Sequence, residues 1–212
     1  MSEVVLYDFW RSSAAYRMRI ALNMAGIAYT SVPVDLTRKQ HKTPEHLARN
    51  PQGLVPVLEI DGLRLTQSLA MLDYLDSTRA MGLLPKEPGA RAQQMAAAHA
   101  IALDIHPVCN LQVISYAAEI TGNRENVRED WMQRFIRPGL EAVEELLGAF
   151  EQAPYACGAT PGLVDICLMP QLYNAHRWKV DVSDLKRICS IEAACGENPA
   201  FAAAYPDLHK PG

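Results

Sequence analysis

Residues 4–22 read VVLYDFWRSSAAYRMRIAL and hold the change from strand to helix that decides the fold of the first third of the chain. The apolar run Val4–Tyr7 is short and β-prone, which predicts a strand. From Met18 to Ala25 the apolar positions recur at i, i+3, i+4 and i+7, which predicts a helix. Gly26 stands where a left-handed helix C-cap is favoured. This stretch therefore predicts a β-loop-α unit.

The alternation of strand and helix signals continues to about residue 80. Tyr29–Val34 reads as a second strand, and residues 37–50 read as a loop with a short helix. Residues 55–60 and 63–66 flank Asp61-Gly62, a dipeptide that favours a type I′ hairpin turn. Ser68 is placed to cap a helix that runs through Leu75. We therefore expect an α/β domain.

The second part of the chain carries helical patterns only. Gly82, Pro85, Pro88 and Gly89 make residues 79–89 a linker candidate, because helix breakers are dense there. Apolar residues at helical spacing then fill three segments, which are 90–120, 127–150 and 163–178. We expect two domains, an α/β domain over residues 1–84 and an all-α domain over residues 90–212.

Composition excludes several classes of function. The chain has 212 residues, 49% of them hydrophobic, and a formal charge of -4, so neither nucleic acid nor an anionic membrane is an expected partner. Its five cysteines form no C-x-x-C pair and no zinc-type spacing, so no metal site is expected. The first residues carry no basic segment followed by an apolar stretch, and we expect a cytoplasmic protein.

Five motifs, in this order, resemble the zeta class of glutathione transferases, the family of maleylacetoacetate and maleylpyruvate isomerases. They are RSSAAYRMRIAL at 11–22, NPQGLVPVL at 50–58, QSLA at 67–70, DIHPVCNL at 104–111 and DICLMPQ at 165–171. The resemblance implies a thioredoxin-like α/β domain joined to an all-α domain, the glutathione transferase fold. It also implies glutathione as cofactor and a homodimer.

Ser12 and Ser13 lie at the predicted start of the first helix, where unpaired N–H groups and the helix dipole favour an anion. A free thiol near pKa ~8.5 is mostly protonated at neutral pH, so a glutathione enzyme needs such a site to hold a thiolate. The resemblance assigns this catalytic role chiefly to Ser12, with Ser13 beside it. The alternative is that one serine is only the helix N-cap.

The resemblance also implies the remaining glutathione contacts. Val55-Pro56 is expected to contain a cis bond and to offer the backbone of Val55 to the peptide backbone of glutathione; the alternative is an ordinary start of a strand. Gln67-Ser68 opens a helix and is expected to receive the γ-glutamyl carboxylate, the alternative being simple capping. His41 and Gln52 lie in segments that the family uses for the glycyl end.

A dicarboxylate substrate, which the resemblance implies, calls for positive charge above the thiolate. Arg11 and Arg177 are the candidates, because the planar guanidinium binds a carboxylate with two bonds; Arg177 could instead be a solvated charge at a helix end. Pro107 should bend its helix and direct His106 and Asn110, four residues apart, into the cleft. We expect His106 to contact glutathione and Asn110 to contact the substrate, although a helical histidine often only packs.

Two positions depart from the family pattern. Ala14 stands where animal and plant members have cysteine, which removes any protein thiol from the site. Gly162 replaces the Ser or Thr that begins a capping box, and Asp165 is expected to remain a structural cap and not an acid. Arg17 and Arg19 are expected to make structural or interface ion pairs.

The implied reaction is glutathione-dependent cis–trans isomerisation of maleylacetoacetate or maleylpyruvate, in aromatic amino-acid or other aromatic catabolism. The thiolate would add to the cis double bond and leave after rotation, and Arg11 would stabilise the enolate. Two alternatives stay open: a conjugating transferase or dehalogenase with the same glutathione site, and a transferase-like interaction protein without activity.

Overall fold

Four short strands form one mixed sheet in the first part of the chain. In the computed structural model, which describes residues 3–211, the strands are β1 Val5–Asp8, β2 Thr30–Pro33, β3 Val57–Ile60 and β4 Leu63–Thr66. They lie in the order β2-β1-β3-β4, with β1 parallel to β2 and the other neighbours antiparallel. Parallel neighbours need a crossover connection, and the helix between β1 and β2 supplies it.

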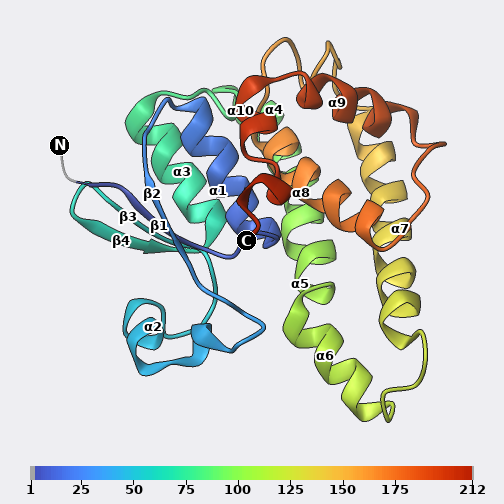
Figure 1. Cartoon of the computed structure of the whole chain (residues 1–212). Helices are drawn as coiled ribbons and strands as arrows, with labels where there is room; N and C mark the ends of the chain where they lie inside the picture. The colour runs from blue at the N-terminus through green and yellow to red at the C-terminus, as the bar shows by residue number, and fades with distance from the viewer. Residues whose placement is uncertain (1–2, 212) are drawn as a thin grey trace. The chain divides into compact units, whose positions relative to one another are not determined.

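Helices alternate with these strands along the chain. They are α1 Ser13–Met24, α2 Pro44–Arg49 and α3 Ser68–Arg79, with the short 3-10 helix η1 Gln40–Lys42 before α2. Figure 1 shows α1 and α3 packed side by side, with α2 apart from them. Leu6, Ile20 and Leu75 are among the fully buried side chains of this core.

Backbone angles confirm the predicted turns. Asp61 and Gly62, with φ of 53° and 78°, both lie in the left-handed region, as a type I′ turn requires. Gly26 has φ 64° directly after the C-cap of α1. The expectation that Ser68 caps α3 is wrong, because the N-cap is Gln67 and Ser68 is the first helical residue.

The last residues of the chain pack with this first part. The contacts divide the chain into a first unit, which joins the residues up to Gly82 with those from Asn198 onward, and a second unit, Leu83–Glu197. In the first unit, α10 Pro199–Ala203 packs against α1, and the 3-10 helix η3 Pro206–His209 follows. Compact units are not the same as independently folding domains, so the limits 1–84 and 90–212 stay a prediction.

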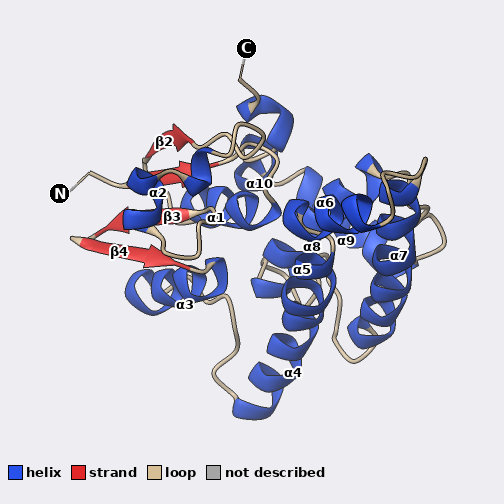
Figure 2. Ribbon diagram, turned by 90° about the horizontal axis from the view of Figure 1, so that it is seen from below, coloured by secondary structure: helices blue, strands red, loops and turns tan. Residues whose placement is uncertain are grey.

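The second unit consists of helices and loops (Figure 2). Its helices are α4 Pro88–His99, the π-helix η2 Ala100–Ile105, α5 His106–Val108, α6 Leu111–Ile120, α7 Val127–Leu147, α8 Leu163–Arg177 and α9 Lys186–Gly196. The α/β first domain and the helical remainder are thereby confirmed. None of the described helices is long and apolar enough to span a membrane.

The segment predicted as one helix over 90–120 is broken. The backbone widens to a π-helix before Pro107, whose missing N–H cannot continue the ladder, and it leaves helical geometry at Asn110, with ψ 163°. Gly139 of α7 allows η2 to approach closely, since a Cβ there would lie 2.5 Å from Cγ1 of Ile105. A π-helix is frequent at functional sites, and this one ends directly before His106.

Candidate active site

Ser12 is the N-cap of α1, and the capping bond does not use its hydroxyl proton. Its backbone is extended, with φ -70° and ψ 121°, and its Oγ accepts the N–H of Ala15 at 3.3 Å. A hydroxyl has two acceptor positions and one proton, so capping the helix leaves that proton free to donate. Capping and stabilisation of an anion are therefore compatible at Ser12. Ser13 is the first helical residue and is buried, 9% exposed.

The guanidinium of Arg11 lies against aromatic rings beside these serines. Its Cζ is 5.6 Å from the ring centroid of Phe9 and 5.5 Å from that of Trp10. A second cation, Nζ of Lys210, lies 5.8 Å from the Trp10 ring. Cation–π contacts of this kind limit where a side chain can point while leaving it half-exposed. Arg11 therefore presents positive charge at the N-terminal end of α1.

The loop before β3 holds a cis peptide bond between Val55 and Pro56, as the resemblance implied. Two side-chain donors converge on the carbonyl of Leu54, Nε2 of His46 at 3.0 Å and Nδ2 of Asn50 at 2.9 Å. Neither the N–H nor the C=O of Val55 makes a hydrogen bond with any residue in the range 3–211. A fixed loop with an unused backbone donor and acceptor is suited to pairing with an extended peptide.

The start of α3 combines a rare backbone conformation with a buried hydroxyl. Gln67 has φ 67° and ψ 107°, and its Nε2 donates to Oε1 of Gln52 at 2.8 Å. Ser68 is 5% exposed, and its Oγ accepts a bond from Nη1 of Arg17 at 3.0 Å. The first N–H groups of a helix face outward here, and such groups favour an anion. Gln52, Gln67 and Ser68 are thus brought together.

His41 lies in η1, beside the same loop. Burial lowers the pKa of its imidazole, and the charges of Lys42 and His46 lower it further, so the neutral ring is favoured at pH 7. Within the described chain its buried Nδ1 has no hydrogen-bond partner. The carbonyl of His41 lies 2.8 Å from the position that a Cβ on Gly53 would take, which shows how closely the loop passes η1.

Of the two candidates around Pro107, one is placed differently from the prediction. His106 begins α5 and is half-buried. Asn110 does not share a helical face with it, because the helix breaks between them and Asn110 is the N-cap of α6. Its Oδ1 accepts the N–H of Val113 at 3.0 Å. The carbonyl oxygen of Asn110 is therefore used as a cap, which leaves its amide N–H groups as the groups able to contact a ligand.

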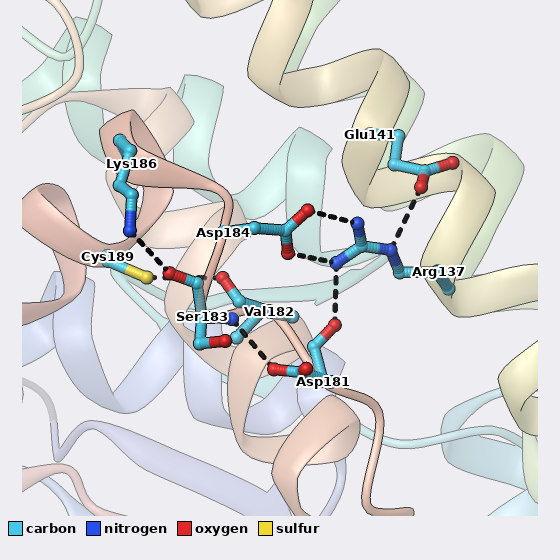
Figure 3. Close-up of polar contacts among 8 residues, drawn as sticks. All are labelled: Arg137, Glu141, Asp181, Val182, Ser183, Asp184, Lys186 and Cys189. Carbon is cyan, nitrogen blue, oxygen red and sulfur yellow. Dashed lines mark hydrogen bonds and ion pairs between the residues drawn. The ribbon is translucent and has the colours of Figure 1, made fainter.

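Arg177 is the last residue of α8 and is exposed, with its guanidinium 4.7 Å from the Trp178 ring centroid. The loop that follows it is held by α7, mainly through Arg137 (Figure 3). Nη1 and Nη2 of Arg137 donate to the two carboxylate oxygens of Asp184 at 2.8 and 2.7 Å, and Nη1 also donates to the carbonyl of Asp181 at 2.7 Å. This bidentate pair fixes the loop next to Arg177.

Asp165 is a structural cap, as expected. It is fully buried and accepts the N–H of Gly162 at 2.8 Å and the N–H of Ala156 at 2.9 Å. Burial raises its pKa, against the effect of these bonds. Burial also raises the pKa of Cys109 and of Cys157 to about 12, so both are thiols at neutral pH. Neither of these two cysteines offers a thiolate.

The candidates fall into two groups. Those in the first unit surround the starts of α1, α3 and β3, and they are Arg11, Ser12, Ser13, His41, Gln52, Val55, Pro56, Gln67 and Ser68. His106, Asn110 and Arg177 belong to the second unit. Among residues 3–211, no group of three or more His, Cys, Asp or Glu side chains is arranged to hold a metal ion.

Sequence reasoning missed two supporting residues, His46 and Asn50. Each is about 2% exposed although its side chain is polar. The sequence shows only that His46 and Asn50 lie a few residues before Leu54. No local pattern predicts that both side chains bond the carbonyl of Leu54.

Comparison with known proteins shows the family to which the chain belongs. Residues 2–77 match the family described as Glutathione S-transferase, N-terminal domain. The chain is 53% identical to a maleylacetoacetate isomerase of Rhizobium meliloti, over 99% of each chain. A holo maleylpyruvate isomerase structure, of a bacterial zeta-class glutathione S-transferase, superposes with a TM-score of 0.92 at 36% identity, covering 95% of this chain and 96% of that one.

A maleylacetoacetate isomerase from Methylobacterium extorquens AM1, solved with malonate and GSH bound, superposes with a TM-score of 0.90 at 37% identity, over 98% of each chain. The similarity therefore extends over nearly the whole length of these relatives. The chain belongs to the zeta class of glutathione S-transferases, in the family of the maleylacetoacetate isomerases.

Proposed function

We propose that this protein is a glutathione-dependent cis–trans isomerase that converts maleylacetoacetate to its fumaryl isomer. The observation that carries the proposal is the 53% identity to a maleylacetoacetate isomerase over 99% of both chains. The site supports it, because the serine pair, the loop before β3 and the start of α3 are all present in one unit. The alternative of an inactive interaction protein has no such support.

The residues of the first unit fit glutathione by their donors and acceptors. The unpaired N–H and C=O of Val55 match an extended peptide backbone, which needs one donor and one acceptor. Ser68 and the N-terminus of α3 match a carboxylate. His41, with a buried ring nitrogen lacking a partner in the described chain, and Gln52 are assigned to the glycyl end. In the second unit, His106 is assigned to glutathione as well.

Glutathione, when bound, supplies a thiolate that adds to the cis double bond and leaves again after rotation about that bond, so it is not consumed. Ser12 donates its remaining proton to this sulfur and so favours the thiolate over the thiol. The N-terminal end of α1 acts in the same direction through its dipole. Ser13 keeps the same end of the helix packed, since it is buried.

Arginines bind the carboxylates of the substrate in this proposal. Arg11 carries its charge next to Ser12 and stabilises negative charge that develops on the substrate oxygen. Arg177 and the amide of Asn110 are assigned to the rest of the dicarboxylate. The malonate bound to the relative from Methylobacterium extorquens, itself a small dicarboxylate, supports this class of substrate.

Turnover assays test the choice of reaction. The purified chain, with and without glutathione, is offered maleylacetoacetate, maleylpyruvate and chlorodinitrobenzene. We expect isomerisation that requires glutathione, fastest with maleylacetoacetate. Faster turnover of maleylpyruvate would indicate that the protein acts in gentisate breakdown. Conjugation of chlorodinitrobenzene without isomerisation would support the transferase alternative.

Substitution of Ser12 tests the mechanism. In Ser12→Ala the sulfur loses a hydrogen bond that is strongest to its charged form, so kcat should fall about 100-fold or more. The calorimetric Kd for glutathione should change by less than about fivefold, because most contacts to the tripeptide lie elsewhere. Ser12→Thr, which keeps a hydroxyl, should retain more activity, and Ser31→Ala, an exposed serine of β2, serves as control. Unchanged kcat in Ser12→Ala would contradict the assignment.

We further propose that the protein is a cytoplasmic homodimer, as the family resemblance implies. Leu54 and Leu63 in the first unit expose 40% and 47% of their surface, more than is usual for leucine, and are candidates for burial in such a contact. Light scattering after size exclusion gives the mass directly. A mass of one chain at micromolar concentration would contradict the dimer.

A further inference from the structure

Two cations lie over the indole ring of Trp10, and they come from opposite ends of the chain. Cζ of Arg11 is 5.5 Å from the ring centroid, and Nζ of Lys210 is 5.8 Å from it. Trp10 and Arg11 directly precede Ser12, whereas Lys210 follows η3. Figure 1 shows this end of the chain beside the start of α1. The C-terminal segment therefore brings a second positive charge to the residues next to Ser12.

A buried arginine holds the C-terminal segment in this position. Nη2 of Arg19 donates to the carbonyl of Trp10 at 2.8 Å, and Nε of the same side chain donates to the carbonyl of Ala204 at 3.1 Å. Its Nη1 pairs with Oδ2 of Asp8 at 2.6 Å, which is the structural ion pair expected for Arg19. One fully buried guanidinium thus fixes both the backbone of Trp10 and the backbone shortly before Lys210. The approach of Lys210 to the ring is therefore built into the fold.

Neither of the two cations over Trp10 forms an ion pair with an acidic side chain among residues 3–211. The first turn of α1 contains no acidic residue, and Asp8, which lies two positions before Trp10, is paired with Arg19. The N-terminal end of a helix adds roughly half a positive charge to the same place. Because like charges repel, an anion that lies beside Arg11 and Lys210 stabilises this arrangement.

The chemistry of the two cations matches a carboxylate of the substrate. In the proposed complex the carboxylates of glutathione are assigned to the start of α3 and to the segment around His41, so neither of them needs the cations over Trp10. The substrate is a dicarboxylate, and Arg11 alone has been assigned to it in the first unit. A guanidinium offers a planar fork and an ammonium offers three rotatable donors, so Arg11 and Lys210 together can satisfy both oxygens of one carboxylate.

We propose that Lys210 is a substrate-binding residue: with Arg11 it receives one carboxylate of the dicarboxylate substrate beside the N-terminal end of α1, and the indole of Trp10 holds both side chains there. The inference rests on the proposed function, since it assumes a dicarboxylate that binds next to the sulfur of glutathione. Stabilisation of the thiolate stays with Ser12. Lys210 should therefore act on the binding of substrate and leave the chemical step unchanged.

Calorimetry on the glutathione-loaded chain tests the inference without using enzyme activity. The probe is malonate, a small dicarboxylate that has no double bond to isomerise. Lys210→Met removes the charge and keeps an apolar side chain, so the Kd for malonate should rise about 3- to 10-fold; the rise is modest because solvent screens an exposed charge. The Kd for glutathione should stay within about twofold, because its contacts lie elsewhere.

Steady-state kinetics give a second readout. In Lys210→Met the KM for maleylacetoacetate should rise by a factor similar to that for malonate, while kcat stays within about twofold, as for a contact made equally in the ground state and the transition state. Lys210→Arg keeps the charge and the contact with the ring, and it should stay within about twofold of the unchanged chain in every measurement. Lys86→Met removes an exposed lysine of the second unit and is the control for loss of net charge.

The outcomes separate the inference from the proposed function. The inference is overturned if malonate binds Lys210→Met as tightly as it binds Lys86→Met, or if it does not bind the glutathione-loaded unchanged chain. A rise in the Kd for glutathione with malonate binding unchanged would also overturn it, as would equal losses in Lys210→Met and Lys210→Arg. Failure of the unchanged chain to bind glutathione would overturn the proposed function before any variant is compared.

Discussion

At the scale of single residues, Gly53 shows how tightly the loop before β3 is built. Its φ is 60°, and an added Cβ would lie 2.8 Å from the carbonyl of His41 and 2.9 Å from Nζ of Lys42. A backbone atom cannot move aside as a flexible side chain can. The loop that carries Val55 therefore depends on glycine both for its conformation and for space.

We predict that Gly53→Ala lowers the free energy of unfolding by about 1–3 kcal/mol and weakens glutathione binding, because the loop must shift away from η1. Gly62→Ala is the matched control, since Gly62 also has a positive φ, of 78°, but nothing lies within 4 Å of its added Cβ. Urea unfolding and calorimetry on both variants measure the difference. Equal losses in the two variants would show that the close approach has no effect.

Residue types were more predictable than residue pairings. Motifs placed Ser12, Gln67 and Ser68 at the starts of helices, because capping and anion binding both depend on local chain direction. The bond from Arg17 to Ser68 joins residues 51 positions apart, and no local pattern encodes it. The N-cap use of Asn110 was missed for another reason, since a π-helix and a break were not foreseen after residue 100.

At the scale of elements, α9 begins without a side-chain cap of its own, and α7 provides one. Glu144, 8% exposed, accepts the N–H of Arg187 at 2.9 Å and that of Ile188 at 3.0 Å. The N-cap residue, Leu185, has no side chain that could do this. A carboxylate at a helix N-terminus satisfies two N–H groups and complements the dipole.

We predict that Glu144→Ala lowers the free energy of unfolding by about 2–4 kcal/mol, because two buried or half-buried N–H groups lose their acceptor. Glu144→Gln, which keeps one oxygen acceptor, should lose less. Glu145→Ala removes the exposed neighbour and is the control. Denaturant unfolding followed by circular dichroism gives the three values; a loss in Glu144→Ala no larger than in the control would refute the capping role.

The strand segments followed closely from sequence, while helix ends in the second unit did not. Asp61-Gly62 fixed the hairpin and its register, because both angles must be positive in a type I′ turn. Pro107 lies in a predicted helix that the structure breaks, but Pro138 and Pro170 lie inside α7 and α8. Proline alone therefore does not show where a helix ends.

At the scale of the whole molecule, stability should depend on pH through His176 and Glu192, which join α8 to α9. Nε2 of His176 lies 2.6 Å from Oε1 of Glu192, and this bond raises the pKa of the imidazole above its usual 6.5. Because the pKa of His176 is higher in the folded chain than in the unfolded chain, the folded chain keeps the imidazole protonated up to a higher pH. The stabilisation is therefore complete below about pH 6.5 and is lost as pH rises through the folded pKa.

The effect should be a few tenths of a kcal/mol, because the two side chains are 50% and 30% exposed. Urea unfolding of the unchanged chain and of His176→Gln at pH 5.5 and 8.5 measures it. We expect the advantage of the unchanged chain to be larger at pH 5.5. An equal difference at the two pH values would show that the pair does not carry the dependence.

The final segment of the chain completes the first unit. Nε of Arg19, in α1, donates to the carbonyl of Ala204 at 3.1 Å, and Nδ2 of Asn23 donates to that of Ala200 at 3.0 Å. During synthesis the sheet and α1 leave the ribosome long before these carbonyls exist. The first unit thus cannot reach its finished hydrogen bonding until residues 198–204 have also been synthesised and have left the ribosome.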